Sequence, residues 1–189
     1  MAMIVETCTF ETERLLVQPW HRRRPDGCSP LDLPNAVAEM LTEPVTRHLP
    51  NSWHGSYSRH RAETWIAERD AESTVLLVGA RPAGDPVGLV ILTETPAGGD
   101  ELVDIRLGYL LAETAWGTGL ATELLGGLVE WCRPQKQIAS IVGGVAEDNR
   151  GSIRVLERHG FTLMPSSTGP GDGELLYGLQ LRGRPLHDR

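Results

Sequence analysis

The residues best placed to do chemistry form a glycine-containing run in the middle of the chain, Trp116-Gly117-Thr118-Gly119-Leu120-Ala121. Gly117 and Gly119 allow the backbone to turn tightly and to approach a ligand closely. A helix is expected to begin directly after them, and a helix start offers unpaired N–H groups and a positive dipole end. The run therefore suits a phosphate or a pyrophosphate, although a glycine before a helix can also be a simple turn.

Two common nucleotide-binding motifs do not describe this run. The dinucleotide fingerprint GxGxxG needs a third glycine, and Thr122 stands at that place. The lysine of a P-loop is missing as well. The ligand of the glycine run must be recognised in another way.

A second polar segment, Asn149-Arg150-Gly151-Ser152, follows about thirty residues later. It lies between a predicted strand and a predicted helix, so Asn149 and Ser152 share one helix start. Asn and Ser are frequent helix caps. Their side chains either cap this helix or act on a bound ligand.

The first half of the chain predicts helices followed by an antiparallel meander. Its expected elements are a strand over 14–20, a short helix from Pro34 that Pro44 closes, a helix capped by Ser58, and strands over 73–81, 85–95 and 102–111. In the last strand the odd positions from Val103 to Leu111 form one apolar face. Asp104, Arg106 and Gly108 share the other face.

The second half changes to alternating helices and strands. An amphipathic helix over 118–132 ends before Pro134, and a strand covered on both faces spans 138–145. A further helix starts at Asn149 or Ser152 and stops at Gly160, and the last strands span 161–164 and 174–181. Without a repeat or an interdomain linker, residues 1–189 are expected to form one α/β domain with a mixed sheet and a core from about 10 to 182.

Three segments together resemble the GNAT acetyltransferase superfamily, and in particular its RimJ/RimL-like branch. They are Leu107-Gly108-Tyr109-Leu110-Leu111, the glycine run, and the stretch from Glu147 to Phe161 that ends in Gly-Phe. The resemblance implies a mixed, twisted sheet of six to seven strands flanked by about four helices. It also implies that acyl-CoA lies in a splay between the strands 102–111 and 138–145.

The resemblance further assigns residues to the acyl donor, acetyl-CoA. Gly119 and Ala121 match the last two fixed places of the family's pyrophosphate loop, while Trp116 stands where Gln or Arg is usual. Backbone donors from 117 to 121 would hold the pyrophosphate, and Asn149 would bind the pantetheine arm. By the same analogy, a backbone N–H of Leu110 or Leu111 stabilises the oxyanion.

The resemblance implies one candidate for the catalytic acid and several for the catalytic base. Leu156 occupies the place of a tyrosine that many family members use to protonate the thiolate, so Ser152 becomes the candidate acid. The usual basic glutamate falls on Ile105, which transfers no proton. Asp104 is adjacent but faces the other way unless a bulge changes the strand's phase. A water chain, His48 or His54 is the alternative base.

The acceptor amine is expected against the loop that contains His48, Trp53 and His54. An aromatic ring beside a cationic amine contributes about 0.5–2 kcal/mol through cation–π attraction. The alternative for Trp53 is packing on the second helix, and for each histidine a plain surface position. Arg22, Arg23 and Arg24 reach a phosphate or belong to a solvated loop.

Composition narrows the partners and the compartment. A net charge of −7 argues against nucleic acid as the main partner and is compatible with a cationic acceptor. The three cysteines, Cys8, Cys28 and Cys132, show no CxxC spacing, which favours reduced thiols and predicts no metal site. Lacking a signal peptide or an apolar run of about 20 residues, the chain is expected in the cytoplasm, away from membranes, as a monomer or homodimer.

Three functions remain open at this stage. The first is N-acetyl transfer from acetyl-CoA to a protein N-terminal or peptide-like amine, by direct attack in a ternary complex. The second is acetylation of a small cationic amine such as an aminoglycoside or a polyamine. The third is a non-catalytic domain that binds acyl-CoA as a sensor or scaffold.

Overall fold

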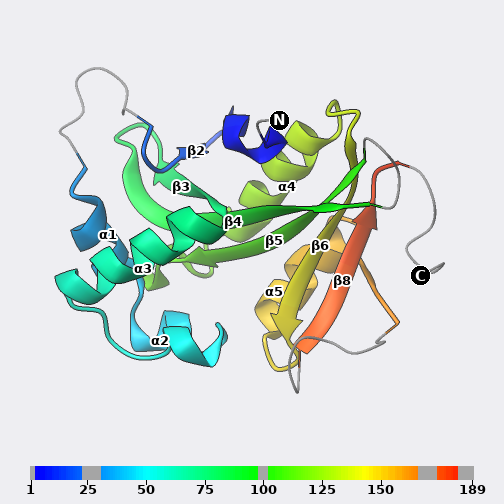
Figure 1. Cartoon of the computed structure of the whole chain (residues 1–189). Coiled ribbons are helices and arrows are strands. Elements are labelled where there is room, and N and C mark those ends of the chain that lie inside the picture. The colour runs from blue at the N-terminus through cyan, green and yellow to red at the C-terminus, as the bar shows by residue number, and fades with distance from the viewer. Residues whose placement is uncertain (1–2, 23–30, 98–101, 166–173, 183–189) are drawn as a thin grey trace.

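The computed structural model describes residues 3–22, 31–97, 102–165 and 174–182. Arg23, Arg24 and Cys28, for which the sequence made predictions, lie outside the described residues. The described part of the chain forms one sheet with helices on both of its faces (Figure 1).

The sheet has eight strands, and only one pair of neighbouring strands is parallel. In spatial order the strands are β1 (Phe10–Glu11), β2 (Leu15–Pro19), β3 (Thr74–Ala80), β4 (Asp85–Pro96), β5 (Val103–Leu111), β6 (Ile138–Ala146), β8 (Glu174–Gln180) and β7 (Thr162–Leu163). Strands β5 and β6 are parallel and every other neighbouring pair is antiparallel. The predicted mixed α/β sheet is confirmed. Its strand number exceeds the expected six to seven, and both β1 and β7 are only two residues long.

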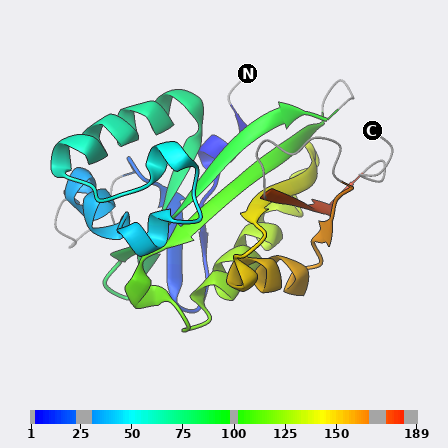
Figure 2. The ribbon, with the colours of Figure 1, turned by 90° about the horizontal axis from the view of Figure 1, so that it is seen from below.

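The helices divide between the two faces of the sheet. Helices α1 (Leu33–Met40), α2 (Glu43–Thr46) and α3 (Arg59–Glu72) lie on one side, and α4 (Leu120–Cys132) and α5 (Arg150–Arg158) lie on the other (Figure 2). Short 3₁₀ turns are η1 (Ile4–Thr7), η2 (Asn51–Trp53) and η3 (Glu113–Ala115). The side of α4 and α5 is called the rear face below, and the side of α1–α3 the front face.

One helix more than expected arises at Pro44. The sequence suggested that this proline closes the first helix, but it lies in the first turn of α2 instead. A proline fits there because the first N–H groups of a helix have no intrahelical acceptor. The predicted cap of the long helix is correct, since the Ser58 hydroxyl accepts a hydrogen bond from the Arg61 N–H at 3.2 Å.

Two apolar clusters hold the layers together. The rear cluster joins α4 and α5 to alternate residues of the strands, among them Leu92, Ile105 and Ile141. The front cluster joins α1 and α3 to the other set of alternate residues, among them Leu89 and Leu110. The period of two along each strand therefore decides which side chains face which set of helices.

Candidate active site

The site begins where the two parallel strands part. The ladder between β5 and β6 runs from the pair Val103–Ile138 to the pair Leu107–Gly143. Beyond it, β5 stays paired with β4 as far as Leu111, and β6 stays paired with β8 as far as Ala146. A splay therefore opens between residues 108–111 and 144–146, as the resemblance implied, and the backbone groups on its two edges face each other.

Alternation along β5 decides which N–H groups face this splay. The Ala112 N–H donates to the Val87 carbonyl at 2.9 Å, on the side of β4. Because N–H directions alternate along a strand, that of Leu110 also points to β4, whereas those of Tyr109 and Leu111 point into the splay. The Leu110 N–H is therefore directed away from the splay, which contradicts its predicted role as an oxyanion donor, and the oxyanion role of Leu111 stays a prediction.

The glycine run connects β5 to α4 and has the expected backbone. Gly117 and Gly119 have φ of +70° and +83°, in the left-handed region that glycine adopts without strain. Helix α4 begins at Leu120, and Gly119 provides no side chain to cap it. Trp116 is 46 % exposed, and its indole N–H donates to the Leu111 carbonyl at 2.8 Å. The run thus ends in a helix start whose first N–H groups suit an anion.

Hydrogen bonds from Arg14, which lies in the turn between β1 and β2, hold this helix start in place and are called the strut below. The guanidinium of Arg14 donates to the Thr118 carbonyl at 3.0 Å and to the Glu123 carboxylate at 2.6 Å. Thr12 and the Arg14 N–H also donate to Glu123. Burial by itself raises the pKa of Glu123, but the hydrogen bonds from Thr12 and Arg14 outweigh it and hold the pKa below its ordinary value.

The second helix start, at α5, is capped by its own side chain. The Asn149 Oδ1 accepts a hydrogen bond from the Ser152 N–H at 3.1 Å. Asn149 is therefore the cap, which leaves its amide Nδ2 available for a ligand. Ser152 lies inside the first turn and contributes its backbone N–H, not its hydroxyl, to this cap.

Sequence reasoning missed one polar group next to Ser152. The Tyr109 hydroxyl is buried on the rear face and has no hydrogen-bond partner within the described ranges. Burial raises the pKa of Tyr109, and the Ser152 hydroxyl, which lies near the phenol without meeting the geometry of a hydrogen bond, partly opposes that rise. The signal was present in the strand pattern, because Tyr109 is the one residue with a hydroxyl on an otherwise apolar face. A buried polar atom without a partner is costly and therefore suggests a function.

Asp104 remains on the front face, away from Ser152. A register irregularity does occur beside it, because Val103 pairs with Ile138 and Asp104 with Ser140, which leaves Ala139 as an extra residue on β6. The irregularity does not change the phase of β5, since Ile105 stays fully buried in the rear cluster. Ser140 donates to the Asp104 carboxylate at 2.6 Å. The basic role of Asp104 stays a prediction.

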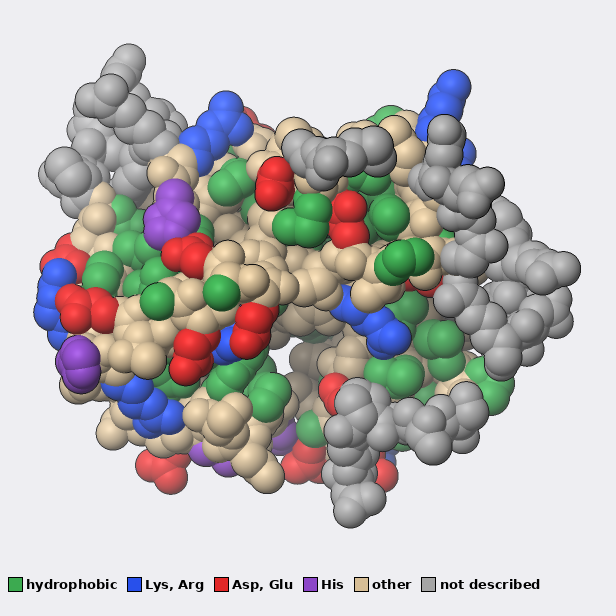
Figure 3. Space-filling view, in the orientation of Figure 1, with side chains coloured by type: hydrophobic (Ala, Val, Ile, Leu, Met, Phe, Trp, Pro, Cys, Tyr) green, Lys and Arg blue, Asp and Glu red, His purple; other side chains and the backbone are tan. Residues whose placement is uncertain are grey.

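Helix α2 crosses the open end of the splay on the front face. At its start, the Thr42 hydroxyl donates to the Glu113 carboxylate in η3, on the β5 side. After its end, the His48 Nδ1 lies 3.3 Å from the Asp148 Oδ1, on the β6 side. The front surface is hollowed between the two halves of the molecule (Figure 3). His48 thus lies at the open end of the splay, which is called the entrance below. Its Nε2 accepts a hydrogen bond from the Arg47 Nε at 3.0 Å.

Trp53 and His54, the other two residues predicted to bind the acceptor, contact side chains and backbone of this chain. The Trp53 ring lies 5.2 Å from the Trp65 ring, and the Arg69 guanidinium lies 4.6 Å from the Trp53 centroid. Packing on α3 is therefore what the structure shows for Trp53. The His54 Nε2 lies 2.8 Å from the Leu49 carbonyl oxygen. Acceptor binding by Trp53 and His54 stays a prediction.

The described thiols are not suited to carry an acyl group. Cys8 and Cys132 are free and buried in the rear cluster. Burial raises the pKa of both thiols, that of Cys132 to about 12, and a thiol in this state is a poor nucleophile. Among the described residues, no cluster of three His, Cys, Asp or Glu side chains could hold a metal ion. None of the described helices has the length and apolar character to cross a membrane.

Comparison with known proteins gives one family and many structures of the same fold. Residues 27–162 match the family model described as an acetyltransferase (GNAT) domain. None of the curated proteins matches the sequence. Because the solved structures below are less than 25 % identical to this chain, their likeness concerns the fold.

Three of these structures illustrate the range of the matches. A GNAT-family acetyltransferase from Bacillus anthracis has a TM-score of 0.70 and 15 % identity, over 92 % of this chain and 99 % of its own. An acetyltransferase from Agrobacterium tumefaciens has a TM-score of 0.68 and 23 % identity, over 95 % and 98 %. RimL, a ribosomal L7/L12 alpha-N-protein acetyltransferase in complex with coenzyme A, has a TM-score of 0.66 and 15 % identity, over 90 % and 96 %.

Proposed function

Because this chain belongs to the GNAT acetyltransferase family, we propose that it acetylates the primary amine of a protein N-terminus or of a peptide-like acceptor, with acetyl-CoA as the donor. The observation that carries the proposal is the splay after Leu107 and Gly143, with an uncapped helix start on one lip and Asn149 on the other. RimL, among the similar folds, acts on a protein N-terminus, which supports this acceptor class.

The residues around the splay fit the donor. The backbone N–H groups from Gly117 to Ala121 would bind the pyrophosphate, because they lie at a helix start that lacks a capping side chain. The Asn149 amide would donate to a carbonyl of the pantetheine arm, since its oxygen is already used by the cap. Acetyl-CoA supplies the activated acetyl group as a thioester.

The splay also offers groups for the transfer itself. In the proposed reaction a C–N bond forms, the C–S bond breaks, the amine loses one proton and the thiolate gains one. The N–H groups of Tyr109 and Leu111 are the candidate oxyanion donors, because both point into the splay. Ser152 is the candidate proton donor, and the Tyr109 hydroxyl beside it is placed to replace the proton that Ser152 gives up.

Removal of the amine proton needs a base that can be reached from the splay. Asp104 lies three residues before the ladder ends, which is about 10 Å along the strand. A proton would therefore reach Asp104 through water on the front face. His48 is nearer to the entrance, but its Nε2 already accepts a hydrogen bond from Arg47. We propose Asp104 as the base, acting through such a water chain.

Release of the free CoA thiol, measured with acetyl-CoA and a panel of amines, tests this function. We expect release that depends on peptides with a free N-terminal amine and that stops when the same peptides are N-acetylated. Preference for aminoglycosides or polyamines would instead favour the small-amine alternative. Tight donor binding without transfer to any amine would favour a sensor or scaffold. Cytoplasmic location and a monomeric or dimeric state stay predictions.

A further inference from the structure

A single basic side chain lies on the front face of the sheet, next to the splay. Arg106 of β5 is the only Lys or Arg within the eight strands that the structure describes. It and Gly108 are the exposed positions of β5, and both lie on the front face, because Ile105 and Leu107 are buried in the rear cluster. Arg106 and Gly108 therefore form an uncovered surface that leads to the splay and is called the β5 floor below.

The charge of Arg106 is not neutralised by any other residue that the structure describes, since Arg106 forms no ion pair there. Its register partners are Thr93 on β4 and Val142 on β6, and neither is charged. The acid on the same face of β5, Asp104, accepts a hydrogen bond from Ser140 at 2.6 Å. The guanidinium, which has five N–H donors, is therefore available to an anion from outside the chain.

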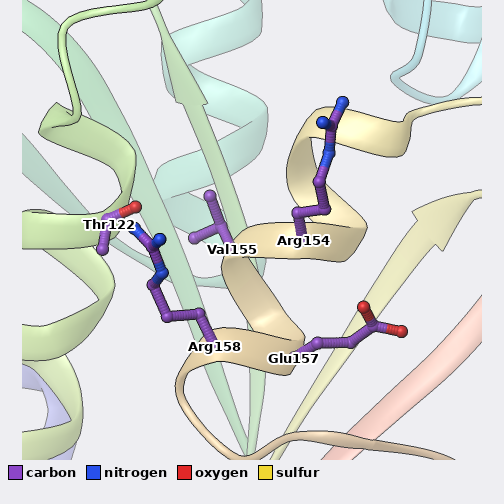
Figure 4. Close-up of a pocket in the computed structure, with 5 residues that line it drawn as sticks. All are labelled: Thr122, Arg154, Val155, Glu157 and Arg158. Atoms are coloured by element: carbon purple, nitrogen blue, oxygen red, sulfur yellow. The ribbon is translucent and has the colours of Figure 1, made fainter.

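Other arginines without an ion pair lie on the opposite face of the sheet. Among the described residues, Arg154 and Arg158 of α5 line a hollow of about 440 Å³ between α4 and α5 on the rear side (Figure 4). The sheet separates this hollow from the entrance. Arg106, in contrast, lies on the face from which an acceptor would enter.

Gly108 keeps the β5 floor open between Arg106 and the splay. It is not among the glycines with a positive φ, so the backbone does not require a glycine there. A Cβ atom on Gly108 would meet only Ile91, at 3.8 Å from its Cβ and 4.0 Å from its carbonyl oxygen, which are ordinary contacts. A glycine weakens the interior of a strand and often marks a place where a ligand approaches closely. The space over Gly108 can therefore hold the acceptor.

The spacing along β5 relates Arg106 to the acceptor amine. Arg106 lies three residues, or about 10 Å, before Tyr109, whose N–H points into the splay. An extended peptide advances about 3.3 Å per residue, so a peptide with its amine at the splay brings one of its first three residues to Arg106. On the basis of the proposed function, we propose that Arg106 determines acceptor specificity by binding an acidic side chain within these three residues. The acceptor class is then an acidic protein N-terminus.

A carboxylate is the side-chain group that matches a guanidinium in both charge and shape. The two groups form parallel, charge-assisted hydrogen bonds, which would fix the peptide at a second point besides its amine. Because Arg106 is exposed before the acceptor binds, its effect lies between that of a surface ion pair and that of a buried charged hydrogen bond. The alternative role of Arg106 is that of a solvated charge that only favours solubility.

Initial-rate kinetics of the whole protein with matched peptides test this specificity. The peptides begin with a free serine amine, carry Glu, Gln or Lys at the second or third residue, and end in an amide that removes the terminal carboxylate. We expect the wild type to show about fivefold higher kcat/KM for the Glu peptides than for the Gln peptides. This preference should shrink as the salt concentration is raised, because salt screens exposed charges.

Substitution of Arg106 should change the preference itself. Arg106→Gln should give equal kcat/KM for the Glu and Gln peptides, and Arg106→Glu should shift the preference to the Lys peptides. Arg133→Gln is the matched control, because it removes an equal, exposed charge at the C-terminal end of α4 on the rear side. It should leave the preference of the wild type unchanged.

Substitution of Gly108 tests the path of the acceptor. Gly108→Val should lower kcat/KM about tenfold or more for all the peptides, because displacing an acceptor by about 1 Å costs up to 100-fold. The calorimetric affinity for acetyl-CoA and the Tm should stay close to those of the wild type. Unchanged peptide kinetics in Gly108→Val would show that the acceptor does not cross the β5 floor and would overturn the proposal.

The remaining outcomes separate the specificity from the proposed function. Equal kcat/KM of the wild type for the Glu and Gln peptides would overturn the specificity and leave acetyl transfer standing. A lower kcat for both peptides in Arg106→Gln, with the preference kept, would mean that Arg106 acts on Asp104 and not on the acceptor. Preference for free glutamate over every peptide would overturn the peptide class. If no amine were acetylated, both proposals would fall.

Discussion

Helices α4 and α5 begin on the two edges of the same splay, but their first N–H groups differ in whether a side chain caps them. Helix α4 follows Gly119, which has φ of +83° and no side chain for capping. Helix α5 follows Asn149, whose Oδ1 binds the Ser152 N–H. Because loss of a capping side chain costs about 0.5–2 kcal/mol, α4 lacks a local stabilisation that α5 has.

The difference shows two ways in which a helix start can serve one ligand. At α4 the unpaired N–H groups are themselves the binding groups, and Arg14 and Glu123 hold the helix start from outside. At α5 the cap satisfies the backbone, so only side chains are left for the ligand and for the reaction. We therefore expect backbone changes to matter most at α4 and side-chain changes to matter most at α5.

Removal of the Ser152 hydroxyl should have the largest effect. Ser152→Ala should lower turnover by about 100-fold, the typical contribution of a general acid, while acetyl-CoA affinity and Tm change little. The Tm should stay unchanged because Asn149, and not the Ser152 hydroxyl, caps α5. Steady-state kinetics, calorimetry and a thermal melt together check this result.

Ser58→Ala is the matched control for Ser152→Ala. Ser58 caps α3 with its hydroxyl, so its loss should cost about 0.5–2 kcal/mol of stability with normal turnover. A Ser152→Ala protein that behaves like this control, with a lower Tm and normal turnover, would mean that Ser152 has no role in proton transfer.

Adding one methyl group to each helix start should give opposite results. Gly119→Ala should weaken acetyl-CoA binding roughly tenfold or more, because a left-handed alanine costs about 1–2 kcal/mol and the loop must shift. Gly151→Ala lies in the first turn of α5, where a Cβ meets only an ordinary contact with the Asn149 Oδ1 at 3.6 Å. It should raise stability by about 0.5–1 kcal/mol. Unchanged affinity in Gly119→Ala would remove the glycine run from the site.

Two substitutions of Asn149 separate its cap from its proposed contact with the donor. Asn149→Ala should lower stability by about 0.5–2 kcal/mol and also weaken donor binding. Asn149→Asp keeps a capping oxygen but loses the amide donor, so we expect normal stability with weakened acetyl-CoA affinity. Chemical denaturation and calorimetry measure the two effects. Normal affinity in Asn149→Asp would limit Asn149 to its cap.

The strut at α4 should give the smallest effect, and one that depends on pH. The pKa of Glu123 is lower in the folded protein than its ordinary value. Its ionised form therefore stabilises the fold above the unfolded-state pKa, and this contribution is lost as the pH falls through the folded-state pKa. Glu123→Gln should cost up to about 1 kcal/mol near neutral pH, the range of a partly exposed ion pair.

The pH dependence distinguishes this strut from general packing. The difference in Tm between wild type and Glu123→Gln should shrink as the pH is lowered through and below the ordinary carboxyl range. Glu130→Gln, on the exposed side of the same helix, should leave the Tm close to that of the wild type. A Glu123→Gln difference that stayed constant with pH would show that charge is not its cause.

The local features of this chain could be predicted from its sequence because their causes are local. The glycines before α4, the Ser58 cap and the alternation along β5 depend on residues within a few positions of one another. The resemblance to a family then supplied the splay and the donor. The small errors, such as the helix expected to end at Pro44, concern a residue that fits either a helix start or a helix end.

The composition of the site was decided only by tertiary contacts. Asp104 stays on the front face because the extra residue beside it lies on β6 and leaves the phase of β5 unchanged. His48 reaches Asp148, a hundred residues later in the sequence, while Trp53 packs against Trp65 and Arg69. The buried Tyr109 hydroxyl and the hollow beside Arg158 exist only because α5 packs next to β5 and α4. No local sequence pattern predicts these contacts, since each depends on how separate elements pack on the two faces of one sheet.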